Sequence, residues 1–408
     1  MKYNLANWKK KFIIIWLGQV VSILTSSIIQ MAIIWYLTDK TKSSTVLSFA
    51  TFIGFLPQAI FGSFAGVFID RYNRKNIMII SDGVIALLTF SLVIVGFLGE
   101  IPIWFIMVIL FGRSIGSAFH NPSLQAITPL IVPNDNLTQY AGYSQCFESM
   151  SYLISPAIAA LLYSLWDLHI IILLDVIGAA FAIFMLLFVK VPNTNRHSKS
   201  FEKTKGYFYE LKEGIRVLRT EKSMLTLVLI SGLYAMIYFP IGTFYPLITM
   251  THFKGTFIES SIVEIVFALG SLIGAYLLGL IAQKIRKVKS IGKSMAIYGI
   301  GLLIIGILPS TGFKIFVLLS LIMGASVPFY RGIQTSIFQM KFESEYLGRV
   351  LSLTSSLTMF AMPLGLVLSG LFAEVIGISR WFFISGIVTV IIAITIISIP
   401  SLKNCCEE

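Results

Sequence analysis

The stretch ILFGRSIGSAFHNP, residues 109–122, places one arginine inside a run of apolar and small residues. Arg113 lies eleven residues after Pro102, where the apolar run opens, and this is roughly 16 Å along a helix that rises ~1.5 Å per residue. At mid-depth of a bilayer an arginine keeps its charge and costs at least about 2.5 kcal/mol, so it must face protein or water. Gly116, Ser117 and His120 share its helical face. This stripe indicates the wall of a solute pathway, with an interhelical clamp as the alternative.

The composition identifies an integral membrane protein. Of 408 residues, 56% are hydrophobic and 12% are charged, and the mean hydropathy is +0.87. Such a chain lacks the polar residues to cover a soluble surface. The net charge of +12 does not indicate nucleic-acid binding, because the basic residues lie in loops between apolar segments. We therefore expect the lipid bilayer as the partner and no nucleic acid.

Twelve segments are long enough to cross a ~30 Å bilayer core as helices, which predicts an all-α protein with twelve transmembrane helices. They lie near residues 12–37, 45–69, 77–98, 102–126, 139–164, 168–189, 224–250, 259–283, 293–309, 313–338, 347–374 and 379–399. An even number of spans puts both termini on one side. The loops on that side hold most of the lysines and arginines, so we expect both termini in the cytoplasm and the protein in the plasma membrane.

A polar, basic linker at 190–223 separates two six-helix halves, residues 1–189 and 224–408. Its second half predicts an amphipathic helix, because four apolar positions share one face away from the basic ones: Phe208, Leu211, Ile215 and Leu218. This helix either lies on an anionic membrane surface or packs against the bundle. The segments GVFIDRYNRK (66–75) and GLIAQKIRK (279–287), and Pro156 and Pro363, occupy corresponding places in the two halves. Such a repeat is typical of transporters with a midplane site.

Three motifs resemble those of the major facilitator superfamily. The loop after the second span matches the family's G-x-x-x-D-R-x-G-R-K/R pattern at Gly66, Asp70, Arg71, Arg74 and Lys75. Asn73 replaces a glycine, and we expect it to hold the same left-handed turn. The resemblance implies a conformational latch between halves for these charged residues.

The other two motifs lie in the fourth and fifth spans. Arg113 followed by Gly116 resembles the fourth-span motif, whose arginine is associated with proton coupling. The fifth span follows the spacing of the antiporter motif at Gly142, Ser151, Ser155, Pro156, Ala159 and Ala160. Across nearly its whole length the chain is similar to the macrolide-efflux branch of Gram-positive bacteria. The resemblance implies a twelve-helix exporter that works by alternating access.

Polar and aromatic stripes indicate which helix faces meet the solute. In the amino-terminal half they are Gln19, Ser22, Ser26 and Gln30 in the first span, and Arg113, Ser117 and His120 in the fourth. In the carboxy-terminal half they are Tyr234, Tyr238 and Tyr245 in the seventh span, and Ser326, Tyr330 and Gln334 in the tenth. If these spans line the cavity, as the family implies, one aromatic and one polar wall suit a bulky amphiphile. Packing alone is the alternative for the tyrosines.

Export against a gradient needs an energy source, and the sequence contains no glycine-rich nucleotide-binding loop. Proton exchange remains, and it requires a buried carboxylate. Glu148, ten residues into the fifth span, is the first candidate, with Arg113 as a nearby cation, and Asp175 is the second. A fixed salt bridge is the alternative role for both. Arg331 is expected near the cytoplasmic end of its span and is left out of the site.

These patterns together predict a monomeric secondary transporter, not an enzyme, without cofactor or metal. It exports drugs, most favourably macrolides, in exchange for protons. Export of another amphiphile, such as a lipid, peptide or biocide, is the alternative. A membrane scaffold that does not transport is a third hypothesis. The buried charges at Arg113 and Glu148 argue against the scaffold, which does not need costly ionisable groups at mid-membrane.

Overall fold

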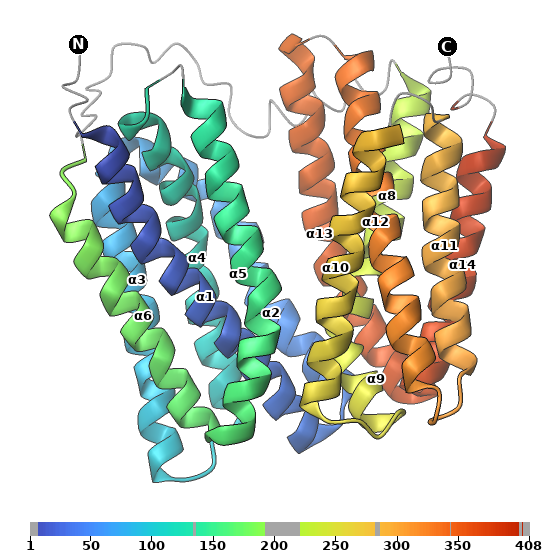
Figure 1. Cartoon of the computed structure of the whole chain (residues 1–408), viewed down its shortest axis with the longest axis horizontal. Helices are drawn as coiled ribbons and strands as arrows, with labels where there is room; N and C mark the ends of the chain where they lie inside the picture. Colours follow the sequence, from blue (N-terminus) through green and yellow to red (C-terminus); the bar gives the residue numbers. More distant parts are fainter. Residues whose placement is uncertain are drawn as a thin grey trace. The chain divides into compact units, whose positions relative to one another are not determined.

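The computed structural model describes residues 7–133, 136–191, 221–281, 286–342, 344–399 and 402, and every regular element in these ranges is a helix (Figure 1). The helices of the first half are α1 (Trp8–Thr41), α2 (Ser44–Arg71), α3 (Arg74–Leu98), α4 (Ile103–Ile131), α5 (Leu137–Leu165) and α6 (Leu168–Phe188). Those of the second half are α8 (Lys222–Thr243), α9 (Tyr245–Thr251), α10 (Phe257–Ile281), α11 (Lys287–Ile307), α12 (Phe313–Lys341), α13 (Ser344–Ile376) and α14 (Ile378–Ser398).

The helices confirm the all-α membrane fold. Within the described ranges, eleven helices are long and apolar enough to cross a membrane, and α5 adds the shorter apolar stretch Met150–Leu165. Large apolar side chains such as Leu87, Leu98 and Val375 point outward and are exposed. Apolar surface on the outside of a bundle is what a bilayer covers. The chain is therefore a multi-pass membrane protein.

The seventh span is broken, contrary to the continuous helix predicted for residues 224–250. Helix α8 ends at Thr243, and the Phe244 amide donates to the carbonyls of Pro240 and Ile241 at 3.0 and 3.1 Å. Pro246 has no amide hydrogen, so it cannot continue the hydrogen-bond ladder across this point. It instead occupies the first turn of α9, where a proline fits.

The chain divides into two compact units with similar internal packing. One comprises Met1–Lys40 and Ala50–Phe201, and the other comprises Thr41–Phe49 and Glu202–Glu408. In the first unit α3 packs against α4 and α6, and in the second α11 packs against α12 and α14. The third, fourth and sixth helices of each half thus meet in the same way, as an internal repeat requires. Most of the linker, residues 192–220 with the expected amphipathic helix, lies outside the described residues.

Asn73 is a helix cap and not a left-handed turn, so that prediction was wrong. Its φ and ψ are −66° and 115°, and its side-chain oxygen accepts the Lys75 amide hydrogen at 3.0 Å. Asparagine is a preferred N-cap because it satisfies a free amide of the first turn. This position is the N-cap of α3, which asparagine fills without a left-handed backbone, so glycine is not required here.

The two basic residues that follow this cap bind the ends of neighbouring helices. Arg74 Nη1 donates to the Ala126 carbonyl near the end of α4 at 2.7 Å. Lys75 Nζ donates to the Leu187 and Val189 carbonyls at the end of α6, at 3.3 and 3.0 Å. Cations at helix carboxyl ends satisfy free carbonyls and oppose the negative end of the dipole. The side chains of Gly66, Asp70 and Arg71 lie outside the described ones, so the latch stays a prediction.

Candidate functional site

Arg113 and Asp175 form an ion pair in the interior of the first unit. Arg113 Nη1 donates to Asp175 Oδ2 and also to Thr89 Oγ1. The Asp175 carboxylate further accepts the Ser26 hydroxyl at 2.6 Å and the Thr89 hydroxyl at 3.2 Å. The side chains of Arg113 and Asp175 are 11% and 1% exposed. One buried charged cluster thus joins α1, α3, α4 and α6.

The cluster combines two expectations that the sequence treated separately. Ser26 was expected to line a pathway and Asp175 to exchange protons, and they meet in one hydrogen bond. The cation expected beside Glu148 instead contacts Asp175. Burying two charges costs several kcal/mol per ion unless their hydrogen bonds are satisfied, and three donors to one carboxylate provide this. These contacts fit the interhelical clamp proposed as the alternative role of Arg113.

The fold itself does not require charge at these positions. Arg113 is the eleventh residue of α4, and the eleventh residue of α12 is Met323. Counted in the same way, the places of Thr89 and Asp175 are taken by Leu302 of α11 and Ser385 of α14, and these three residues of the second unit are buried. The same helix packing is therefore built without an ionisable group. This contrast favours a functional role for the charges of the first unit.

Two glycines allow the helices around the ion pair to approach closely. A Cβ on Gly178, one turn beyond Asp175, would lie 2.2 Å from Thr25 Oγ1 of α1. A Cβ on Gly116, one turn beyond Arg113, would lie 2.6 Å from Ile85 Cγ1 of α3. Small residues of this kind are what brings membrane helices into contact. Gly116 therefore faces α3, the helix that also carries Thr89, one of the two partners of Arg113.

Tyrosines from three helices cluster in the second unit. The ring centroid of Tyr234 lies 5.7 Å from that of Tyr238, 4.8 Å from that of Tyr330 and 6.1 Å from that of Tyr298. Tyr238 and Tyr298 are 5.3 Å apart. Nearby, Gln334 Nε2 donates to Ser231 Oγ at 2.6 Å. The structure thus brings together Tyr234, Tyr238, Tyr330 and Gln334 of the residues expected in the seventh and tenth spans.

Sequence reasoning missed two members of this cluster. Tyr298 lies on α11, where no second aromatic residue repeats at helical spacing to mark the face. Arg331 was set aside as a residue of the membrane edge, but its guanidinium carbon lies 5.6 Å from the Tyr238 ring centroid and 5.7 Å from that of Phe239. A guanidinium over aromatic rings is a favourable cation–π contact. The aromatic wall therefore carries a cation.

Tyr245 lies beyond the helix break that separates it from Tyr234 and Tyr238. The helix break at Phe244 places it in α9, where its ring packs against Phe267, Phe316 and Phe382 at centroid distances of 5.8, 5.8 and 6.4 Å. A stripe counted at 3.6 residues per turn holds only while the helix continues. The Tyr245 hydroxyl, however, interacts with Tyr298 and Tyr238, so this residue borders the tyrosine cluster.

The remaining predicted residues occupy varied positions. Gln19 and Ser22 are buried, whereas Gln30 and Ser117 are partly exposed. Ser326, Ser151 and Ser155 donate to carbonyls of their own helices. Pro156, Ala159 and Ala160 are buried, Glu148 is partly exposed, and Gly142 lies outside the described side chains. A single helix face is therefore not enough to assign a cavity wall.

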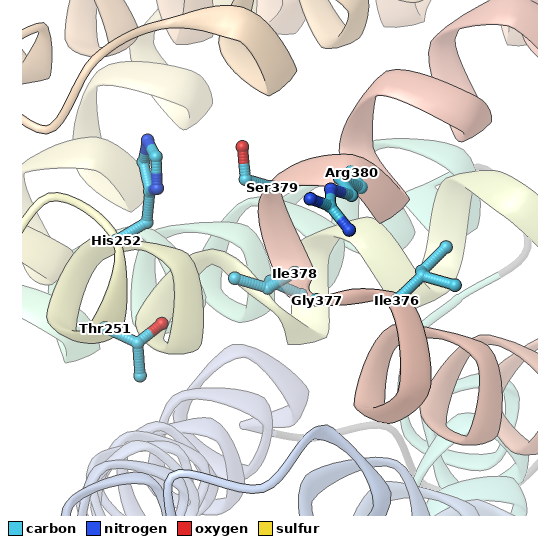
Figure 2. Close-up of a pocket in the computed structure, with 7 residues that line it drawn as sticks. All are labelled: Thr251, His252, Ile376, Gly377, Ile378, Ser379 and Arg380. Carbon is cyan, nitrogen blue, oxygen red and sulfur yellow. The ribbon is translucent and has the colours of Figure 1, made fainter.

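A pocket of 270 Å³ lies at one end of the second unit, between the end of α9 and the turn from α13 to α14 (Figure 2). Two of its polar side chains already have partners. Ser379 Oγ donates to the Gly306 carbonyl at 2.7 Å, and His252 Nε2 lies 2.8 Å from the Leu308 carbonyl. No residue of the ion pair or the tyrosine cluster lines it. We do not place the substrate there.

Comparison with known proteins gives matches over nearly the whole chain. A sequence model of the Major Facilitator Superfamily matches residues 15–263 and 227–402. Macrolide efflux protein A of Streptococcus pyogenes is 51% identical over 393 residues, which cover 96% of each protein. A protein of the same name from Enterococcus faecalis is 49% identical over 79% of this chain and 99% of its own length. The crystal structure of a nucleoside transporter, 13% identical, superposes with a TM-score of 0.74 over 96% of this chain and 99% of that one.

Proposed function

Because the chain belongs to the major facilitator superfamily, we propose that this membrane transporter exports macrolide antibiotics in exchange for protons. The observation that carries the substrate class is the 51% identity, over 96% of both chains, to a protein named for macrolide efflux. The structure supports the proposal with two contrasting sites. One unit holds a buried ion pair and the other holds an aromatic cluster.

The ion pair supports proton coupling. A carboxylate held by Arg113, Thr89 and Ser26 stays charged while these donors are in place. A helix movement that withdraws Arg113 leaves the carboxylate buried and favours its protonation. Binding and release of one proton at Asp175 thus follow the conformational change. Glu148, partly exposed on α5, remains a second candidate for the coupling residue.

The tyrosine cluster supports an amphiphilic substrate. Tyr234, Tyr238, Tyr298 and Tyr330 offer aromatic faces with polar tips. A macrolide presents a large lactone ring with hydroxyl and sugar substituents, so it needs broad apolar contact and few polar anchors. We propose Tyr238 as a contact residue, because its ring is partly exposed while Tyr234 and Tyr330 are buried.

The basic residues support the orientation. Lys9, Lys10, Arg74 and Lys75 lie in the first turns of α1 and α3, which are alternate spans of the first unit and begin on the same side of it. By the positive-inside rule this is the cytoplasmic side of the plasma membrane. An even number of spans then puts both termini in the cytoplasm. In this orientation protons enter the cell down their gradient, and the drug leaves the cell in exchange.

The test is the accumulation of labelled erythromycin in a macrolide-sensitive host with and without the chain. We expect lower accumulation in expressing cells, and recovery when an uncoupler collapses the proton gradient. A quaternary ammonium biocide tested in parallel separates a macrolide exporter from an exporter of other amphiphiles. Equal erythromycin levels in both cells, at confirmed expression, would rule out macrolide export.

A further inference from the structure

A second layer of polar side chains crosses the first unit, two helical turns from the ion pair. The first layer consists of Ser26, Thr89, Arg113 and Asp175. Seven residues further along each helix, toward the end where α1 and α3 begin, lie Gln19, Asp82, His120 and Ala182. Seven residues keep nearly the same helix face and span about 10 Å. Three of these four positions are again polar.

The second layer contains a buried acid–imidazole contact. His120 Nε2 of α4 lies 3.2 Å from Asp82 Oδ1 of α3. Because α3 and α4 are antiparallel, moving seven residues along both helices leads from the Arg113–Thr89 contact to this one. Asp82 is 4% exposed and His120 is 7% exposed. His120 therefore contacts α3 through Asp82.

Several polar atoms of this layer have no hydrogen-bond partner in the described part of the chain. They are Oδ2 of Asp82, Nε2 of His120, which approaches Asp82 Oδ1 without the geometry of a hydrogen bond, and both amide atoms of Gln19, whose side chain is fully buried. A buried polar group that lacks a hydrogen-bond partner destabilises the folded state. Such groups are normally satisfied by bound water or by an ion. The unpaired atoms of this layer are therefore available as hydrogen-bond partners for a small polar ligand.

We propose that the second polar layer, Gln19, Asp82 and His120, binds a proton together with water, and passes it between Asp175 and the cytoplasmic side. This inference rests on the proposed proton-coupled export. With a neutral imidazole, Asp82 carries the only charge of the pair. One proton bound there neutralises the pair, either as carboxylic acid with imidazole or as carboxylate with imidazolium. Its release to water on the cytoplasmic side restores the starting state.

Asp82 and His120 are the two titratable groups that meet within this layer. Helix α1 and helices α3 to α6 carry further described charged or titratable groups: Lys9, Lys10, Lys11, Tyr36, Asp39 and Lys40 of α1, Arg74 and Lys75 of α3, Arg113 of α4, Tyr140, Tyr143, Glu148, Tyr152 and Tyr163 of α5, and His169 and Asp175 of α6. Arg74 and Lys75 bind helix-end carbonyls, and Arg113 binds Asp175. His169 packs against Phe97, at a ring distance of 4.5 Å. Asn121 Oδ1 lies 3.5 Å from His120 Nδ1 and adds no charge.

Ile85 separates the two layers. Its side chain fills the space beside Gly116, one turn from Asp82 on α3. A proton cannot cross ~10 Å of apolar packing in one step, so a route needs a second binding group and a movement of α3 against α4. The layer supplies that group, and Asp82 and His120 lie on the two helices, α3 and α4, between which the movement is required.

The experiment uses the purified full-length protein in proteoliposomes, with two assays of labelled erythromycin. Counterflow exchanges drug for drug and needs no net proton movement, whereas accumulation under an imposed pH gradient needs the whole proton route. We expect Asp82→Asn and His120→Gln to keep counterflow within about twofold and to lose accumulation by about tenfold or more. The control Asp167→Asn removes an exposed carboxylate of the loop before α6 and should match the wild type in both assays.

The outcomes separate this inference from the proposed function. Wild-type protein without counterflow would refute macrolide transport itself. Variants that accumulate drug within about twofold of the wild type would refute the second proton site. If both variants lose counterflow and accumulation equally, the contact only holds the helices together, and the inference is also overturned. If Asp82→Asn does not fold, His120→Gln still tests the second proton site, because the glutamine amide can donate to Asp82 and so preserve the contact between the helices.

Discussion

At the scale of single residues, Asp175 is the residue on which the proposed proton coupling depends most. Its carboxylate balances the buried charge of Arg113, so Asp175→Asn leaves that charge without a counterion. We expect the variant to lose about 3 kcal/mol of stability, as other buried pairs do when one partner is removed. Thermal denaturation of the detergent-solubilised protein measures this. Glu100→Gln is the control, because it removes the acid of the exposed pair Lys40–Glu100.

The double variant Asp175→Asn with Arg113→Gln separates stability from coupling. Removing both charges leaves no unpaired ion, so most of the lost stability should return. Accumulation driven by a pH gradient should remain abolished, because neither amide releases a proton. A double variant that still builds an erythromycin gradient would exclude Asp175 as the coupling residue, and Glu148→Gln would be the next variant to test.

The pair of Lys40 and Glu100 shows the contrasting case of an exposed ion pair. Lys40 Nζ donates to Glu100 Oε1 at 2.6 Å. This hydrogen bond, more than the charge alone, lowers the pKa of Glu100 below its ordinary value. Both groups are solvated, so the pair contributes little to stability and is weakened by salt. The depth of Asp175, and not the presence of an ion pair, is what makes its protonation a transport step.

Tyr238 is the residue where substrate choice can be changed. Its ring packs on Tyr234 and Tyr298 under the Arg331 guanidinium. We expect Tyr238→Ala to alter the relative export of different macrolides by several-fold, with proton movement intact, because it removes aromatic area and no charge. Resistance profiles of expressing cells measure this. Tyr276→Ala, an exposed tyrosine of α10, is the control, and equal loss for every drug would indicate a structural role.

At the scale of helices, the second unit depends on close packing of α10 against α12. A Cβ on Gly274 would lie 2.1 Å from the Ala325 carbonyl oxygen, and backbone cannot move aside. We expect Gly274→Ala to destabilise the solubilised protein by about 1–3 kcal/mol. Gly279→Ala lies on the same helix with open space around the new Cβ, so it should not lower the melting temperature. Equal melting temperatures would show that α10 packs differently.

The sequence predicted the helices better than their partners. Apolar length and the basic loops located every span within several residues, because a ~30 Å hydrocarbon core imposes a minimum length. Pro240 and Pro246 signal the break at Phe244 in the sequence, but the length of the apolar segment 224–250 led to the prediction of one continuous helix. Asp82 drew no attention because a lone acid near a span end resembles an interface residue. The sequence shows how deep in the membrane a residue lies along its helix, but it does not show which neighbouring helix that residue contacts. The pairing of Arg113 with Asp175 was therefore not predicted.

At the scale of the whole molecule, the two units share a packing scheme and differ in chemistry. The first holds two polar layers among α1, α3, α4 and α6, and the second fills the corresponding helix positions with Met323, Leu302 and Ser385 and gathers tyrosines elsewhere. We infer a division of labour in which one repeat handles protons and the other contacts the drug. It follows that substitutions in the second unit that leave the charge unchanged should alter which drugs are exported, without changing the number of protons moved per drug.

The most direct measurement of the central claim is proton movement caused by drug movement. Purified protein is reconstituted in vesicles that contain a pH-sensitive dye, and an erythromycin gradient is imposed across the membrane without a pH gradient. The account predicts that protons move opposite to the drug, that an uncoupler removes the signal, and that the Asp175→Asn, Arg113→Gln double variant lacks it while retaining drug counterflow. Erythromycin transport by the wild-type protein with no accompanying proton movement would contradict it.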